Sequence, residues 1–93
     1  MNLQVFAKEN YEICEKAQQV LSRAGVVPEM RYVEGAAATP ENLADFAWYD
    51  WTDTPPLVVA TEGDKVLGRW VAADIKYAWL PKVRHWLAEH RTA

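Results

Sequence analysis

The sequence predicts an α/β fold, a mixed four-stranded sheet with helices on both faces, with elements in the order βαβ, α, ββ, α. Two patterns carry this prediction. A short apolar strand, an amphipathic helix and a second strand follow one another at the start, which indicates a parallel pair with a right-handed crossover. Later, an apolar run at 57–60 and a second run at 66–71 flank a tight turn, which indicates an antiparallel hairpin.

The first half of the chain contains clear local signals. Residues 3–7 form a compact apolar run that suits a buried strand. The apolar positions 13, 17, 20, 21 and 24 have helical spacing, so we expect a helix from Glu12 to Ala24, ended by Gly25. Residues 30–33 alternate and contain good strand formers, which predicts a second short strand.

A second helix begins after the loop at 35–38. Thr39 is a suitable cap, Pro40 has the φ angle of a first helical residue, and Glu41 places negative charge in the first turn. We expect this helix to run to residue 49 or 50. Its inward stripe is predicted to be Leu43, Phe46, Ala47 and Trp51.

The last third of the chain is predicted to hold a hairpin and two helices. The uninterrupted apolar run at 57–60 is typical of a strand covered on both faces. Residues 62–65 form the turn, and 66–71 return beside it. Pro81 is unfavourable inside a helix, so we expect one helix at 74–79 and another from Leu80 or Pro81.

Length and composition indicate one globular domain over residues 1–93. The chain has 51% hydrophobic and 25% charged residues. Its one cysteine cannot form an internal disulfide, which favours a reducing compartment. The N-terminus has no signal-peptide pattern, and no apolar run approaches the ~20 residues that span a bilayer. We therefore expect a soluble, cytoplasmic protein with no membrane partner.

The charge is distributed unevenly. Residues 1–63 carry ten acids and four bases, whereas residues 64–93 carry three acids and six bases. In an acidic chain these few bases are better explained by a solvated terminal helix than by a nucleic-acid site. His85 and His90 are five residues apart, without the partners of a metal site, so neither nucleic acid nor a metal is predicted.

Three segments, taken together in order and spacing, resemble the glutaredoxins, a family with the thioredoxin fold. The first runs from Val5 through Lys8, Tyr11 and Cys14 to Leu21, and is similar to the family's strand, lysine, Cys-x-x-Cys and helix. The others are Thr54-Pro55-Pro56 before the third strand, and the hairpin strand from Lys65 to Val71. The resemblance covers residues 3–74.

In this resemblance the cysteine pair is degenerate. Tyr11-Glu12-Ile13-Cys14 places Tyr11 at the nucleophile's position and leaves only the second cysteine. An alternative alignment, with Cys14 at the nucleophile's position and Ala17 at the second position, fits less well, because Lys8 and Leu21 then no longer match the corresponding positions of the family. A phenol forms no disulfide, so a dithiol mechanism is excluded. Cys14 has two interpretations: a buried structural thiol, or a monothiol that reacts with glutathione.

The resemblance also implies ligand-binding residues. In the family the lysine matching Lys8 binds the ligand's carboxylate, and a cis-proline, here Pro55 with Pro56 as the alternative, places the backbone of Thr54 beside Tyr11. Asp74 matches an acidic residue that receives the amino end of glutathione, although Ala72-Ala73 replaces the family's two glycines. Tyr11 either contacts a ligand or packs as a loop residue against Pro55.

The sequence therefore predicts a glutaredoxin-like protein without its nucleophilic cysteine, which binds glutathione or an extended peptide beside the cis-proline. No cofactor is expected other than glutathione as ligand or co-substrate. The alternative is a glutathione-linked monothiol oxidoreductase acting through Cys14. A third hypothesis is an interaction protein that uses its tryptophan-rich helices. For the five tryptophans as a group, core packing is the preferred interpretation, with Trp51 and Trp70 near the site.

Overall fold

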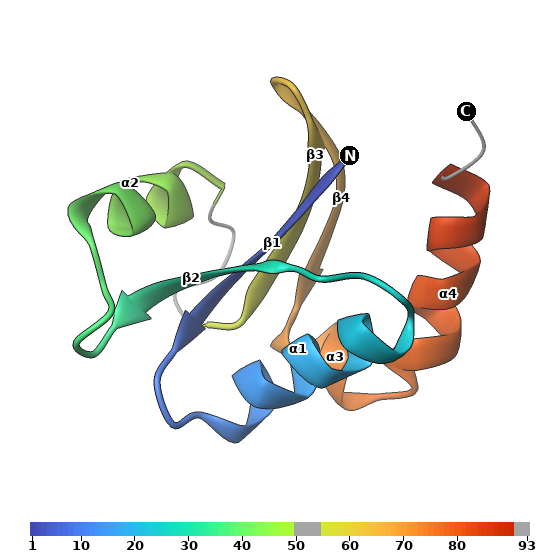
Figure 1. Cartoon of the computed structure of the whole chain (residues 1–93), viewed down its shortest axis with the longest axis horizontal. Helices are drawn as coiled ribbons and strands as arrows, with labels where there is room; N and C mark the ends of the chain where they lie inside the picture. The colour runs from blue at the N-terminus through green and yellow to red at the C-terminus, as the bar shows by residue number, and fades with distance from the viewer. Residues whose placement is uncertain (50–54, 91–93) are drawn as a thin grey trace.

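The computed structural model describes residues 1–49 and 55–90. Its elements follow the predicted order (Figure 1). They are β1 Asn2–Lys8, α1 Glu12–Arg23, β2 Glu29–Glu34, α2 Pro40–Tyr49, β3 Leu57–Glu62, β4 Lys65–Val71, α3 Ala72–Lys76 and α4 Trp79–His90.

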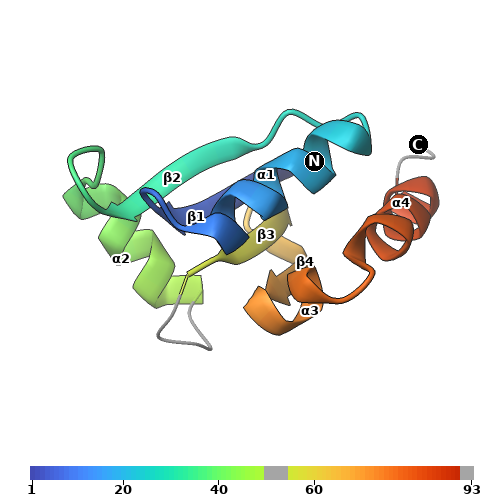
Figure 2. The same cartoon turned by 90° about the horizontal axis from the view of Figure 1, so that it is seen from below.

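The four strands form one sheet in the order β2-β1-β3-β4. Strands β1 and β2 are parallel, while β3 is antiparallel to both β1 and β4. Helix α2 covers one face, and α1, α3 and α4 cover the other (Figures 1 and 2). The predicted mixed sheet with helices on both faces is confirmed.

Alternate residues of the central strands supply two separate cores. On the side of α1, α3 and α4, Val5 and Val58 pack with Leu21 and Trp79. On the side of α2, Phe6, Val33, Leu57 and Val59 form a smaller cluster. Because β3 contributes to both cores, its apolar run is uninterrupted, as the sequence indicated.

Three of the five tryptophans pack between β4 and α4. The Trp70 ring lies edge-on to Trp86, with 4.9 Å between ring centroids, and 6.1 Å from Trp79. Gly68 makes room for this cluster, since a Cβ there would lie 2.7 Å from the Trp70 ring and 2.9 Å from the Trp86 ring. The prediction of core packing therefore holds for this group. Trp48 is exposed, and Trp51 lies outside the described residues.

The predicted inward stripe of α2 is wrong in part. Phe46 does face the sheet, together with Tyr49, but Leu43 is 50% exposed and Ala47 is also exposed. The helix is rotated so that the polar residues Asn42 and Asp45 turn toward β2 instead.

Arg31 of β2 explains this rotation. Its guanidinium donates to Gln4 Oε1 of β1 at 2.7 Å and to Asn42 Oδ1 at 2.9 Å, and it pairs with Asp45 Oδ2 at 2.7 Å. It also lies 5.1 Å from the centroid of the Phe6 ring. A nearly buried charge requires such partners, so α2 presents its polar residues to Arg31.

The ends of the helices agree with the sequence signals in most places. The backbone N–H of Asn42 donates to Thr39 Oγ1 at 3.1 Å, which confirms the cap of α2. The C-terminal helices begin earlier than predicted: α3 starts at Ala72, and α4 starts at Trp79 with Pro81 in its first turn, where the missing N–H is tolerated. Among the described residues, no helix is both long and apolar enough to cross a bilayer.

Candidate functional site

Strand register brings most of the predicted site residues to one end of the sheet. Phe6 pairs with Leu57, and Leu57 pairs with Val71. The end of β1 with Lys8, the Pro55-Pro56 segment before β3, and the start of α3 with Asp74 therefore all lie at this end. Tyr11 follows Lys8 after a short loop. Thr54 lies outside the described residues.

Tyr11 occupies the N-cap position of α1. Its backbone is extended, with φ −109° and ψ 117°, and its carbonyl accepts the N–H groups of Cys14 at 3.0 Å and Glu15 at 3.2 Å. Its half-buried ring packs against the core formed with α1. The predicted start of this helix at Glu12 is confirmed.

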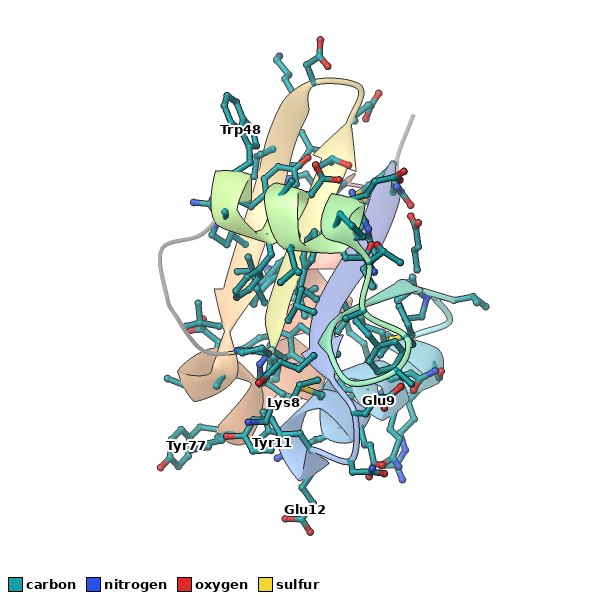
Figure 3. The ribbon with its side chains drawn as sticks, turned by 90° about the vertical axis from the view of Figure 1, so that its left-hand side faces the viewer. Lys8, Glu9, Tyr11, Glu12, Trp48 and Tyr77 are labelled. Carbon is teal, nitrogen blue, oxygen red and sulfur yellow. The ribbon has the colours of Figure 1, made fainter. Side chains whose placement is uncertain are left out.

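Lys8 lies against Tyr11. Its Nζ is 4.8 Å from the centroid of the Tyr11 ring, and Figure 3 shows the two side chains beside one another. The same Nζ lies 3.6 Å from Glu34 Oε2. Because both partners of this ion pair are well exposed to solvent, the pair contributes little to stability, and the ammonium group is available to a ligand that competes with Glu34.

Glu9 is a neighbouring residue that the sequence analysis missed. Its carboxylate accepts the backbone N–H groups of Ala36 and Ala37, each at 3.2 Å, and so holds the loop between β2 and α2. The loop turns at Gly35, with φ +94°, where a Cβ would collide with the Glu9 side chain. The signal was present in the sequence, because a glycine-alanine tract has no side-chain acceptors for its own N–H groups.

Cys14 lies in the core. Its side chain is 2% exposed and packs in the cluster that contains Ala17 and Leu21. Burial raises the pKa of its thiol above the ordinary value of 9.0, and the charge of Glu15 raises it further. A backbone hydrogen bond from Lys8 and the charge of Lys8 act in the opposite direction without outweighing burial. At neutral pH Cys14 is therefore a protonated thiol.

This raised pKa predicts a loss of stability in alkaline solution. The unfolded chain releases the Cys14 proton near pH 9.0, whereas the folded protein releases it only at higher pH. The contribution of the protonated Cys14 thiol to the free energy of unfolding is thus complete below pH 9.0, and it is lost as the pH rises through the folded-state pKa. We expect the free energy of unfolding, measured in urea from pH 8 to 10.5, to fall less steeply with pH in Cys14→Ala than in the wild type. Equal slopes would contradict the prediction.

The proline segment contains a cis peptide bond. Among the described residues it joins Pro55 to Pro56, which was the alternative in the sequence analysis, while the bond between Thr54 and Pro55 lies outside the described residues. The sequence left both open because each X–Pro bond is a tertiary amide with only a small trans preference. Both prolines are buried immediately before β3.

Asp74 lies in the first turn of α3 and is already engaged. Its Oδ2 accepts the backbone N–H of Val71 at 2.9 Å, which satisfies a free donor at the start of this helix. Although Oδ2 accepts this hydrogen bond, the Asp74 side chain is exposed to solvent.

Two cavities lie near α1, one along its first turns and one beyond its C-terminal end. One of about 380 Å³ is lined by Glu12, Ile13, Glu15, Lys16 and Gln19, and it begins directly after Tyr11. A larger one, about 550 Å³, lies at the opposite end of the sheet, where Leu3, Val26 and Leu87 contribute to its wall. Of these two cavities, the first borders the predicted site. Trp70, which the sequence analysis placed near the site, packs with Trp79 and Trp86.

Comparisons with known proteins identify the fold. No family model matches the sequence, and the search of curated proteins found no match. Among solved structures, thioredoxin 1 from Thermosipho africanus TCF52B superimposes with a TM-score of 0.59, over 99% of this chain and 100% of that one, at 15% sequence identity. The chain has a thioredoxin-like fold. A likeness at this identity shows the fold alone.

Proposed function

We propose that this chain is a thioredoxin-fold binding module that holds glutathione or an extended peptide, without dithiol chemistry. The ligand lies along the edge formed by Lys8, Tyr11, Pro55 and Asp74, and the sequence adds Thr54, which is outside the described residues. The observation that carries the proposal is the start of α1. There a tyrosine ring lies beneath a lysine ammonium, while the single thiol of the chain is buried one turn further on.

The chemistry of this edge suits an extended ligand with a carboxylate. Lys8 supplies a positive charge, and the first turn of α1 supplies N–H groups that have no partner within the helix. Tyr11 offers a ring face on which an apolar group packs. The cavity beside Ile13 extends the surface along α1.

A peptide fits this edge better than glutathione does. Asp74, which would receive the amino group of glutathione, already accepts a hydrogen bond from Val71. Ala72 and Ala73 add side chains where close approach of the ligand backbone is needed. An extended peptide depends mainly on main-chain hydrogen bonds beside the proline segment, and needs neither feature.

The second candidate function is monothiol exchange with glutathione through Cys14. Its support is the interaction of Lys8 with Cys14, since the charge and the backbone hydrogen bond both favour the thiolate. Burial acts against it, because the attacking sulfur must reach the disulfide.

Chemical-shift titration tests the proposal. Uniformly ¹⁵N-labelled protein is titrated with reduced glutathione and, separately, with a hexapeptide of alternating Thr and Val that has a free carboxylate. We expect saturable shifts at Lys8, Tyr11, Thr54 and Asp74, with affinity of about 1 mM, which corresponds to about −4 kcal/mol. Lys8→Ala should weaken binding, and Lys82→Ala, which removes an exposed lysine on α4, should not.

The outcomes separate the candidates. Shifts confined to one ligand identify the class of ligand. An absence of chemical-shift changes at all four residues with both ligands would overturn the binding proposal. Rapid gain of one glutathione by the folded protein from glutathione disulfide, read as intact mass, would favour the monothiol instead.

A further inference from the structure

The loop at 35–38, between β2 and α2, binds a carboxylate of the protein itself. The backbone N–H of Ala36 donates to Glu9 Oε2, and that of Ala37 donates to Glu9 Oε1, each at 3.2 Å. Two successive backbone N–H groups thus converge on one anionic group, as they do in the backbone concavities that bind anions in other proteins. The occupant of this concavity is the side chain of Glu9.

The backbone at Gly35 brings the loop close to this carboxylate. Its φ is +94°, a value that favours glycine, and its carbonyl accepts the N–H of Ala38 at 3.2 Å. A Cβ at Gly35 would collide with the Glu9 side chain. Ala36 and Ala37 follow with small side chains, and both residues are exposed. A carboxylate that arrives from solvent therefore meets little steric hindrance beside these two N–H groups.

Glu9 is held in a way that a ligand can replace. Its side chain is exposed, and so are the two alanines that donate to it. Exposed hydrogen bonds make a small net contribution to stability, because water replaces them when they break. Another carboxylate can therefore take the two N–H groups while Glu9 turns to solvent.

The loop continues the proposed ligand edge beyond Lys8. The strands lie in the order β2-β1-β3-β4, and Lys8 pairs with Glu34 where β1 and β2 end. Gly35 follows directly, about 5 Å from β1, which is one strand spacing. The Lys8 ammonium lies 3.6 Å from Glu34 Oε2, so a positive charge stands beside the loop. Figure 3 shows Lys8, Glu9 and Tyr11 on one face, at the same end of the molecule.

We propose that the loop at 35–38 is a carboxylate-binding site, which Glu9 occupies in the free protein. The free C-terminus of an extended peptide displaces Glu9 and accepts hydrogen bonds from the N–H groups of Ala36 and Ala37. The choice of a peptide C-terminus rests on the function proposed above. Capture of a C-terminal carboxylate by backbone N–H groups is a recurring mode of peptide recognition. From Asp74 to this loop the ligand crosses four strand ends, about 14 Å, which about four extended residues span.

Glu9 acts as an internal competitor for this site. Because it belongs to the same chain, its carboxylate is present at a high effective concentration, and a small free anion competes with it poorly. A peptide that also contacts Tyr11 and the proline segment gains further binding energy and can displace it. Glu9 therefore selects a ligand that binds the whole edge over one that offers a carboxylate alone.

The test uses one peptide in two forms. The hexapeptide of alternating Thr and Val is titrated into ¹⁵N-labelled wild type and Glu9→Ala, once with a free C-terminal carboxylate and once amidated. We expect the free acid to shift the backbone N–H signals of Ala36 and Ala37. It should bind Glu9→Ala about tenfold more tightly than the wild type, because the hydrogen bonds of Glu9 no longer have to break. The amidated form should leave both signals unchanged.

Glu41→Ala is the matched control. Glu41 is an exposed acid in the first turn of α2, directly after the loop, so this variant removes the same charge without vacating the two N–H groups. Its affinity for the free acid should stay within about twofold of the wild type. Glu9→Gln keeps the length of the side chain and removes its charge, so it provides the same comparison if the loop loosens in Glu9→Ala.

Sodium acetate tests the loop without the rest of the ligand. It should shift the N–H signals of Ala36 and Ala37 in Glu9→Ala and leave them unchanged in the wild type. If Lys8 and Tyr11 shift with neither form of the peptide while acetate gives this result, the proposed function fails and the loop remains a carboxylate site that Glu9 occupies.

Three results would contradict the proposal. The first is a free-acid peptide that shifts Lys8 and Tyr11 but neither Ala36 nor Ala37 in Glu9→Ala and Glu9→Gln, in which case the ligand edge stands without this site. The second is an amidated peptide that binds Glu9→Ala as tightly as the free acid does. The third is an equal gain of affinity in Glu41→Ala, which would mean that only the net charge matters.

Discussion

Cys14 in the folded protein is expected to react with a thiol reagent more than about a thousandfold more slowly than in the unfolded chain. Its side chain is 2% exposed in the core behind α1. A reagent therefore reaches the sulfur only when the core opens, and domains of this size open with free energies of about 5 kcal/mol or more, where each 1.4 kcal/mol is tenfold. The raised pKa of the thiol lowers its reactivity further.

The measurement is the rate of absorbance change with 5,5′-dithiobis(2-nitrobenzoic acid) at pH 8, in buffer and in guanidinium chloride. The double variant Cys14→Ala/Ser22→Cys is the matched control, because Ser22 is exposed on the same helix. That variant should react at similar rates under both conditions. If wild-type Cys14 reacts at a rate within tenfold of this control, the thiol is accessible, and monothiol exchange becomes the better candidate function.

Phe6→Ala is expected to lower the free energy of unfolding by about 3–5 kcal/mol, the usual cost of removing a buried aromatic side chain. Phe6 is fully buried at the centre of the smaller core. Its ring centroid lies 5.8 Å from that of Phe46 and 6.0 Å from that of Tyr49, so it is the main surface on which α2 rests. The Arg31 guanidinium beside the ring would also lose a packing partner.

Urea unfolding followed by circular dichroism checks this value. Leu43→Ala, on the exposed face of the same helix, is the control, and it should change the free energy of unfolding by less than about 0.5 kcal/mol. A change below 1 kcal/mol for Phe6→Ala would mean that α2 contributes little to the stability of the sheet. In that case the smaller core would not be part of the cooperative unit.

The fold was predictable because its signals are local. The helix at Glu12 and the cap at Thr39 each depend on residues within one or two turns, and the structure contains both. The strand at 57–60 is readable because burial on both faces removes polar residues from it. Order along the chain and the handedness of crossovers then leave few topologies.

The rotation of α2 and the details of the site were not predictable in this way. Arg31 attracts Asn42 and Asp45, but it is distant from them in sequence, and an apolar pattern alone assigns polar residues to the solvent. The choice between Pro55 and Pro56 depends equally on tertiary context. The positions of Tyr11 and Cys14 at the start of a helix were predictable, because a helix start is a local feature of the sequence. The hydrogen bonds of Glu9 were not predictable in this way, because they join residues that are 27 and 28 positions apart.

The contacts of Arg31 also specify the register of the sheet. Arg31 pairs with Phe6 across the parallel strands, and its guanidinium bonds to Gln4, which lies on the same face. If β1 slipped by one residue, Gln4 and Phe6 would turn to the opposite face, and Arg31 would face an apolar side chain. The planar fork of an arginine reaches Gln4, Asn42 and Asp45 at once, which a lysine cannot do. One side chain thus selects a single alignment of two strands and a helix and penalises the neighbouring alternatives.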